Sequence, residues 1–447
     1  MLKTISELLW GRGTVLLLLG TGFFLTLRTG GLAWRNLPYA LCISLGRGAR
    51  ENKRHSVSSF SALMTTLAAT LGTGNIVGVA TALVSGGPGA LLWMEVSALI
   101  GMSLILAEST LAVKYRRKNR CGQWLGGPMY VMEARLGRFG KLCGCIFSLF
   151  TVAAALGMGS MTQAHAAAAA LQSINGPPPH RTGAILAVLS FLIIMGGIRC
   201  ISRLSSIIVP FMAVLYLAGG MAVIVAHLDR IPSVFCHIVR DAFSFRAAAG
   251  GTAGAAIRFG IARGVFSNEA GMGSSAIAAA AADTDSPVKQ GYINMTAPFF
   301  DTIVMCTVTG LAICCSGVLG ATDASGQAIN GAALTLLAME SVLGPSGTLF
   351  VAVSVVCFAF FTILGWEYIG EIAFSYLSGD RFSSFYRFIF SLAALIGACI
   401  PLDAVFSFSD ICNALMCIPN LLSLLLLSGE VTRDLRAYEQ QKVRKKL

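Results

Sequence analysis

Apolar stretches of 18 or more residues recur along the whole chain, and this recurrence restricts its fold more than any other feature. Each stretch is long enough to cross the hydrocarbon core of a bilayer as an α-helix. The composition agrees, since 55% of the 447 residues are hydrophobic and 12% are charged, whereas soluble domains are near one quarter charged. A membrane β-barrel would show short alternating segments instead. The sequence therefore predicts an all-α polytopic membrane protein.

Eleven transmembrane helices are expected. Their approximate ranges are 8–27, 59–85, 89–113, 146–171, 182–198, 205–227, 254–282, 290–315, 346–377, 384–401 and 405–429. The first apolar run has no small-residue cleavage site and is followed by Arg28. We therefore expect a retained helix there rather than a signal peptide.

The distribution of basic residues predicts the orientation. With the N-terminus outside, the cytoplasmic segments hold 25 of the 33 Lys and Arg residues, and the external segments hold 6. Because basic loops stay on the cytoplasmic side, this asymmetry places the C-terminus in the cytoplasm. The net charge of +12 thus indicates no nucleic-acid partner. We interpret the C-terminal "KVRKKL" first as a topology signal and second as a contact with anionic lipid.

Residues with catalytic or metal-binding chemistry form no recognisable motif. The thirteen cysteines lie mostly in apolar runs, where free thiols pack as small apolar groups. The five histidines have no metal-ligand spacing, and we find no nucleophile–base pair or nucleotide loop. The sequence therefore predicts no enzyme, no resident cofactor, and no metal beyond a transported Na⁺. The lipid bilayer is the expected environment, and no obligate protein partner is evident.

Two spans are interrupted at their centres by glycine and polar residues. The second span carries "GTGN" at 72–75, and the seventh carries "GVFSNEAGMG" at 264–273. When the first span is left out, these are the opening helices of two sets of five. Because each set has five spans, which is an odd number, the second set crosses the membrane in the opposite orientation to the first. Paired interruptions of this kind mark the midplane binding site of secondary transporters.

An interrupted helix offers ligands of both signs. Free backbone N–H groups attract an anion, and free C=O groups attract a cation. One site can therefore hold both ends of an amino-acid zwitterion, and its carbonyls can also ligate Na⁺. Neutral side-chain oxygens add to these ligands at Thr73, Asn75, Ser267 and Asn268.

Two other interpretations of "GTGNIVG" are weaker. A dinucleotide-binding loop requires G-x-G-x-x-G after a strand, whereas the spacing here is G-x-G-x-x-x-G and no strand precedes it. Close packing of helices through small residues explains Gly78, Gly86 and Gly89. It does not explain Asn75, because a polar side chain inside a span is costly and is usually functional.

The chain resembles the alanine/glycine:cation symporter family, also called sodium:alanine symporters. The segments that carry the resemblance include "ALMTTLAATLGTGNIVGVATAL", "IARGVFSNEAGMGSSAIAAAAADTDSPVKQG", "TILGWEYIGE" and "DICNALMCIPNLLSLLLLSGEV". The resemblance implies one N-terminal helix before a leucine-transporter-type core of five plus five inverted helices. It also implies Na⁺-coupled uptake of small neutral amino acids, mainly alanine and glycine, across a bacterial inner membrane.

The resemblance also implies a substrate site. Its residues are expected to be Gly72, Thr73, Gly74, Asn75, Gln163, Phe266, Ser267, Asn268 and Trp366. For Gln163, an interhelical hydrogen bond is the alternative role. Trp366 is expected to cover the side-chain pocket and exclude large side chains. An interfacial position for this tryptophan is less consistent with about ten apolar residues on either side.

The resemblance also implies a set of cation ligands, from which this sequence departs at one position. In the leucine-transporter fold, a hydroxyl pair joins backbone near Ala69 and Gly72 at a second sodium site, but here the pair is Phe361 and Thr362. Asp301 is a costly carboxylate inside a span, and with Thr302 it is a further candidate for cation binding. Asn75 completes the set of expected cation ligands. Since Phe361 cannot ligate a cation, proton-coupled or uncoupled transport on the same fold remains an alternative.

Charged residues near the breaks suggest supporting roles. Glu269 is expected to brace the second break, and Arg263 is expected to form an external gate with Asp410. His165 is either a titrating group near the site or a packed neutral imidazole. The predicted organisation is an N-terminal helix and basic loop at 1–58, a first repeat at 59–227, a second repeat at 228–429, and a basic cytoplasmic tail at 430–447. A membrane enzyme or a nutrient receptor would require features that we do not find.

Overall fold

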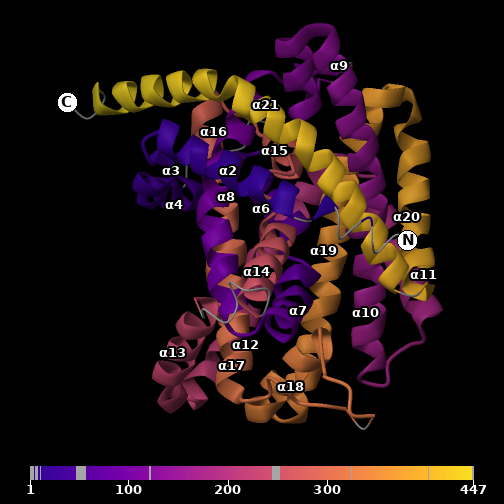
Figure 1. Cartoon of the computed structure of the whole chain (residues 1–447). Coiled ribbons are helices and arrows are strands. Elements are labelled where there is room, and N and C mark those ends of the chain that lie inside the picture. The colour runs from indigo at the N-terminus through magenta and orange to yellow at the C-terminus, as the bar shows by residue number, and fades with distance from the viewer. Residues whose placement is uncertain are drawn as a thin grey trace.

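The computed structural model describes residues 5, 9–10, 12–46, 57–119, 122–243, 252–323, 325–400 and 402–444. These residues are almost entirely helical, with one short antiparallel pair of strands, β1 (Arg117–Lys118) and β2 (Trp124–Leu125). Figure 1 shows the helices packed into a bundle with the C-terminal part of α21 extending beyond it. Residues 47–56 of the predicted basic loop and 445–447 of the predicted tail lie outside the described residues.

The first half of the chain forms the N-terminal helix and the first predicted repeat. Its elements are α2 (Arg12–Arg28), α3 (Leu32–Arg35), α4 (Leu37–Leu45), α6 (Ser59–Thr70), η1 (Thr73–Asn75), α7 (Val77–Gly86), α8 (Gly89–Lys114), α9 (Pro128–Ala154), η2 (Ala155–Met161), α10 (Thr162–Gln172), α11 (Pro179–Ile194) and α12 (Gly197–Ala226).

The second half contains the second predicted repeat. Its elements are η3 (Leu228–Arg230), α13 (Ile231–Ala242), α14 (Thr252–Asn268), α15 (Ser274–Ala280), α16 (Pro287–Asn294), η5 (Phe299–Cys306), α17 (Thr307–Ser316), α18 (Ala332–Leu343), α19 (Pro345–Ser378), η6 (Asp380–Phe382), α20 (Ser383–Cys399) and α21 (Leu402–Arg444). The segments η2 and η5 are π-helices inside longer helical runs.

Several helices are long and apolar enough to cross a membrane. Among the described residues there are 6 such helices, or 7 when the bent pair α6 and α7 counts as one span. Shorter apolar helices, including α2, α11 and α20, coincide with other predicted spans. The fold is therefore that of a multi-pass helical membrane protein, and the count of eleven spans stays a prediction.

Both predicted interruptions are present. The helix that begins at Ser59 stops at Thr70, and the chain resumes after a bend of 58°. The second interruption follows Asn268, where Glu269 has a φ of +55° and Gly271 and Gly273 have φ of +84° and +81°. Left-handed backbone of this kind is costly for any residue except glycine. The strain at Glu269 therefore marks a segment whose conformation its surroundings fix.

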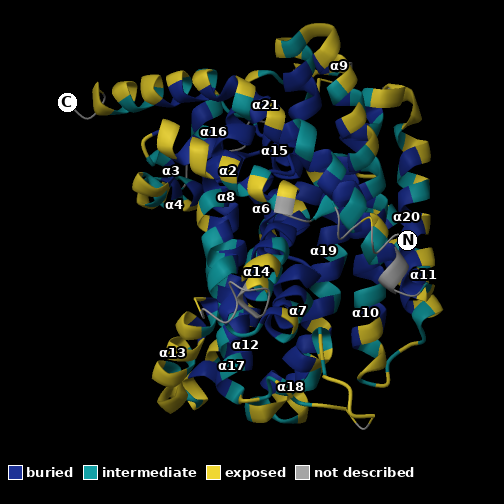
Figure 2. Cartoon of the chain, viewed as in Figure 1, coloured by how far each residue is buried: buried dark blue, intermediate teal, exposed yellow. Residues whose placement is uncertain are grey.

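Burial separates the inner helices from the outer ones. Every residue of α6 and of α15 is buried, and Figure 2 shows buried residues in dark blue throughout the interior of the bundle. The outer helices α11 and α12 expose large apolar side chains such as Leu192 (65% exposed) and Phe211 (68% exposed). An apolar outer surface is what a bilayer requires of the protein that it surrounds.

The structure adds helices where hydropathy alone predicts loops. The helix α13 lies inside the segment 228–253, and α18 lies between the predicted spans 290–315 and 346–377. Likewise α9 begins at Pro128, before the predicted start at 146, and α21 continues as helix through Arg444 rather than ending at 429. A search for long apolar runs does not detect these pieces, because α18 has only 12 residues and the others carry charged residues.

The small residues that follow the first break have different roles. A Cβ added at Gly86 would lie 3.2 Å from the carbonyl oxygen of Ala255, and Gly89 lies against the backbone of α13. Both glycines therefore allow close helix packing, as predicted. Gly78 differs, because a Cβ added there would meet no atom within 4 Å. For Gly78 the packing explanation was wrong.

Candidate functional site

The two interrupted helices lie against each other. A Cβ added at Gly74 would lie 3.3 Å from Cα of Ser267, and the side-chain amide of Asn75 donates a hydrogen bond of 3.0 Å to the Ser267 hydroxyl. The residues come from η1 and from the end of α14, which are 192 positions apart in the sequence. The two breaks therefore form one continuous site.

Asn75 closes the first break from within. Its Oδ1 accepts a hydrogen bond of 3.1 Å from the backbone N–H of Gly72. Its Nδ2 donates to both the carbonyl oxygen and the Oδ1 of Asp301, at 2.9 and 2.8 Å. An amide side chain at this position satisfies backbone that the missing helical hydrogen bonds would leave unpaired.

Asp301 lies at the junction of the two breaks. It belongs to the π-helix η5, and its carboxylate accepts hydrogen bonds of 2.8 Å each from Asn75, Ser267 and Thr302. The residue is fully buried, and none of the ion pairs between described residues includes it. A buried carboxylate with hydroxyl and amide neighbours but no basic partner is suited to a small cation. π-helical turns are frequent at functional sites.

Asn268 and Thr302 extend this cluster along the second break. The Asn268 amide donates to the Thr302 hydroxyl at 3.4 Å, and its oxygen accepts the backbone N–H of Ala270 at 3.1 Å. Asn268 therefore caps unwound backbone, as Asn75 does in the first break. The predicted cation residues Asn75, Asp301 and Thr302 lie together with the predicted substrate residues Ser267 and Asn268.

Gln163 connects a third helix to the first break. Its Oε1 accepts the backbone N–H of Thr73 at 3.3 Å, and its Nε2 donates to the carbonyl oxygen of Met158 at 3.2 Å. Met158 lies in the π-helix η2, directly before α10. The structure therefore shows the interhelical hydrogen bond expected for this amide, and that bond is made to the broken segment itself.

Trp366 lies inside the bundle and not at the membrane interface. Its indole is fully buried in α19, and its Nε1 donates a hydrogen bond of 2.8 Å to Glu269. The second oxygen of Glu269 accepts from the Ser274 hydroxyl at 2.5 Å. Glu269 therefore braces the second break by linking it to α19 and to the first residue of α15.

Thr362 forms a separate polar contact with the end of α6. Its Oγ1 lies 3.1 Å from the carbonyl oxygen of Ala68 and 3.5 Å from that of Leu71, and a Cβ added at Gly72 would lie 2.6 Å from it. The carbonyls that face the hydroxyl therefore belong to Ala68 and Leu71, next to the predicted Ala69 and Gly72. Phe361 is buried, with its ring against Phe360.

The predicted gate residues are not joined by an ion pair in this structure. The Arg263 guanidinium lies over the rings of Phe266 and Phe406, at 5.5 and 6.0 Å from their centroids. The ion pairs between described residues do not include one between Arg263 and Asp410. The backbone carbonyl of Asp410 accepts the indole N–H of Trp10 at 2.7 Å. Phe266 thus serves as a platform for Arg263 as well as a neighbour of the break.

Two buried acids outside the predicted set contact or adjoin the site. Asn420 of α21 donates to Glu108 at 2.8 Å and to the carbonyl oxygen of Gly271 at 2.9 Å, which ties the second break to two further helices. Glu367 follows Trp366, and both of its carboxylate oxygens are buried without a hydrogen-bond partner. The sequence signal for these residues is a polar side chain inside an apolar run.

The site is closed to solvent on all sides. Asn75, Ser267 and Asp301 are each at most 1% exposed, Gln163 is 2% exposed, and Trp366 is 0% exposed. His165, by contrast, is only partly buried, and its Nδ1 has no hydrogen-bond partner. A ligand can reach the closed site only after helices move, which is the behaviour of an alternating-access transporter.

Comparisons with known proteins agree with this geometry. The model of the family described as "Sodium:alanine symporter family" matches residues 1–447. The chain is 44% identical to the sodium/alanine symporter AgcS of Methanococcus maripaludis, over 98% of this chain and 97% of that protein. It is 35% identical to a putative sodium/proton-dependent alanine carrier protein, YrbD of Bacillus subtilis, over 98% and 92% of the two chains.

A solved structure identifies the fold. The structure of MhsT in complex with L-phenylalanine matches with a TM-score of 0.62 at 16% identity, covering 84% of this chain and 90% of that chain. At this identity the match shows the leucine-transporter-type fold alone. Taken with the full-length family match, it means that the chain belongs to the sodium:alanine symporter family and is a membrane transporter, a Na⁺-coupled amino-acid symporter, rather than an enzyme.

Proposed function

We propose that this symporter carries small neutral amino acids, chiefly alanine and glycine, into the cell, with its N-terminus outside and its C-terminus in the cytoplasm of a bacterium. The observation that carries the proposal is the contact between the two breaks at Asn75 and Ser267, with the Asp301 carboxylate beside them. Backbone N–H groups at the first break would bind the substrate carboxylate, and carbonyls near Phe266 would bind its ammonium group.

Gln163 suggests how substrate enters this arrangement. Its oxygen holds the Thr73 N–H through a long hydrogen bond of 3.3 Å. A substrate carboxylate is a stronger acceptor than a neutral amide, because charge-assisted hydrogen bonds are stronger. The carboxylate would therefore replace Gln163 at this N–H. The released amide would then donate to the substrate instead.

The size limit is assigned to Trp366. Its fully buried indole packs against Gly159, where an added side chain would displace the tryptophan. Trp366→Ala is expected to let larger amino acids compete with alanine. A competition panel of the twenty amino acids and D-alanine measures this, and an unchanged profile would contradict the role of Trp366 as a cover.

Two clusters are proposed for Na⁺. One is Asp301 with Asn75 and Thr302, and the other is Thr362 with the carbonyls at the end of α6. Asp301→Asn keeps the shape of the side chain but removes its charge. We expect this variant to lose most Na⁺-driven uptake while it remains correctly folded. Wild-type Na⁺ dependence in Asp301→Asn would exclude this carboxylate from the cation site.

The decisive experiment is alanine uptake into proteoliposomes. A Na⁺ gradient should drive uptake, and choline should not replace it. Uptake that follows a pH gradient and ignores Na⁺ would favour the proton-coupled alternative. Asn75→Ala and Asn268→Ala are expected to abolish uptake at normal expression. Gln163→Ala should weaken it strongly, whereas Gln172→Ala, an exposed glutamine on the same helix α10, provides the matched control.

A further inference from the structure

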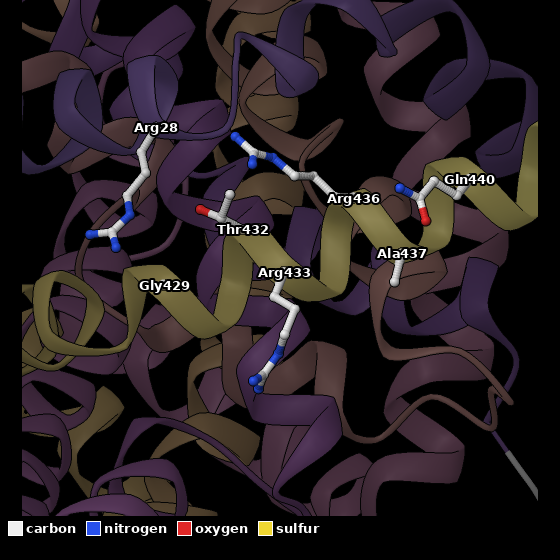
Figure 3. A pocket seen from close by; sticks show the side chains of 7 residues that line it. All are labelled: Arg28, Gly429, Thr432, Arg433, Arg436, Ala437 and Gln440. Carbon is white, nitrogen blue, oxygen red and sulfur yellow. The ribbon is translucent and has the colours of Figure 1, made fainter.

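A basic cavity lies where the end of α2 meets the C-terminal part of α21. Its volume is about 500 Å³. Figure 3 shows the residues that line it, which are Arg28, Gly429, Thr432, Arg433, Arg436, Ala437 and Gln440. Three of the seven are arginines and none is acidic. A cavity with this lining attracts an anion.

The arginines are available to a ligand. Neither Arg28 nor Arg436 forms an ion pair with any described residue, and Arg433 has only the neighbouring Asp434, at 4.0 Å. Figure 3 shows Arg28 and Arg436 on one side of α21, next to Thr432, with Arg433 on the other side in this view. Planar guanidinium groups bind phosphate oxygens in a bidentate manner.

Arg28 is held in place against α21. Its Nη1 donates a hydrogen bond of 2.7 Å to the Ser428 hydroxyl, and its guanidinium lies 5.5 Å from the ring centroid of Phe24. A Cβ added at Gly429 would lie 3.2 Å from Nη2 of Arg28, so glycine allows this close approach. The cavity therefore has a preorganised wall.

Exposed apolar side chains lead directly to this cavity. On α2, Leu27 is 64% exposed and directly precedes Arg28. On α21, Leu426 is 65% exposed and lies one turn before Gly429. On both helices an exposed leucine thus precedes the arginines, in the order in which a bilayer changes from acyl chains to headgroups.

We propose that this cavity binds the phosphate group of an anionic membrane phospholipid. The phosphate lies between Arg28 and Arg436, with Arg433 at the rim, and the acyl chains follow Leu27 and Leu426. A lipid bound in this way joins the N-terminal helix, which lies outside the two five-helix repeats, to the last helix of the core. The proposal does not depend on which amino acid is transported.

The experiment measures the thermal stability of the purified full-length protein in detergent during titration with lipid. Phosphatidylglycerol should raise the melting temperature, whereas phosphatidylcholine should have little effect. Each arginine near a headgroup contributes about five-fold in affinity. The double variant R28Q/R436Q should therefore require about 25-fold more phosphatidylglycerol for the same rise. Arg138→Gln, an exposed arginine on α9, is the matched control and should titrate like the wild type.

Two further measurements distinguish the sources of phosphate and the effects of misfolding. Inorganic phosphate in place of lipid should leave the melting temperature unchanged, and an equal rise would overturn the lipid assignment. Native mass spectrometry of the wild type and of R28K/R436K, which preserves charge and fold, should show retained phosphatidylglycerol in the first and less in the second. Equal lipid retention or equal titration by R28Q/R436Q would also overturn the proposal.

Discussion

The indole of Trp366 donates a hydrogen bond of 2.8 Å to Glu269, a residue whose backbone φ is +55°. This bond joins α19 directly to the segment where the second break begins. The side chain proposed to cover the substrate is therefore tied to the backbone proposed to bind it. If α19 moves during the transport cycle, either the interrupted segment moves with it or the hydrogen bond between Trp366 and Glu269 is lost.

Replacing either partner of this bond should impair transport to different degrees. Trp366→Phe keeps an aromatic ring but removes the donor to one oxygen of the buried Glu269 carboxylate, which costs about 1.5–3 kcal/mol. We expect alanine uptake at subsaturating substrate to fall at least about ten-fold. Glu269→Gln should be milder, because its amide oxygen can still accept the indole N–H. Trp93→Phe removes another hydrogen-bonded indole, one that bonds to Ala242 of α13, and serves as the control.

A double-mutant cycle gives the decisive readout for this pair. If the bond is the important interaction, the combined variant should be no worse than Trp366→Phe alone. Strictly additive losses in initial uptake rate would show that the two residues act independently.

The hydroxyl of Thr362 should set the affinity for Na⁺. Its Oγ1 lies 3.1 Å from the carbonyl oxygen of Ala68 and 3.5 Å from that of Leu71. Thr362→Ala is expected to raise the half-saturating Na⁺ concentration about ten-fold, since a lost oxygen ligand costs about 1.4 kcal/mol. Thr362→Ser should restore it. Thr151→Ala, a buried threonine bonded only to its own helix, is the control.

Uptake measured against Na⁺ concentration tests this expectation. A half-saturating concentration that is the same in wild type and Thr362→Ala would place the cation elsewhere, with Asp301 as the remaining candidate. A change in the alanine requirement without a change in the Na⁺ requirement would assign Thr362 to packing instead.

Neutralising each of two glutamates that lie one turn apart on α19 should affect the stability of the protein differently. Glu371 pairs with Arg387 at 2.8 Å, whereas both oxygens of Glu367 are buried without a partner. Glu367→Gln removes the cost of burying an unpaired charge and should leave the melting temperature equal or higher. Glu371→Gln strands a partly buried arginine and should cost about 1–3 kcal/mol of stability.

Thermal unfolding of the purified variants, followed by intrinsic fluorescence, measures both effects in one experiment. The two substitutions are chemically identical and lie on the same helix, so each controls for the other. The prediction would be contradicted if Glu367→Gln lowered the melting temperature and Glu371→Gln left it unchanged.

The residues of the candidate site stand out in the sequence for a physical reason. A polar side chain inside a span is costly and is usually functional. This rule singles out Asn75, Ser267, Asn268 and Asp301. Their hydrogen-bond partners could not be predicted in the same way. Asn75 and Asp301 are 226 positions apart, and contacts between them depend on the rotation and depth of separate helices.

The contacts of the charged side chains could not be predicted either, for the same reason. Charge alone suggested that Arg263 pairs with Asp410, yet the Arg263 guanidinium lies over Phe266 and Phe406. Opposite charge on two helices does not determine whether the side chains face each other. Likewise, the indole N–H of Trp366 could have had any buried acceptor, and its choice of Glu269 depends on how α19 is turned toward the break.

The close contact between α19 and α6 predicts how the site tolerates one added methyl group. A Cβ at Gly365 would lie 2.7 Å from the backbone nitrogen of Ala69 and 2.9 Å from its Cα, just before the first break. Backbone cannot yield as a flexible side chain does, so Gly365→Ala should push the two helices apart. We expect loss of Na⁺-driven alanine uptake and a lower melting temperature.

Gly20→Ala in α2 adds the same methyl where no atom lies within 4 Å, and it should be neutral or stabilising by up to about 1 kcal/mol. Uptake by Gly365→Ala at the rate of Gly20→Ala would show that this helix contact is not needed for transport.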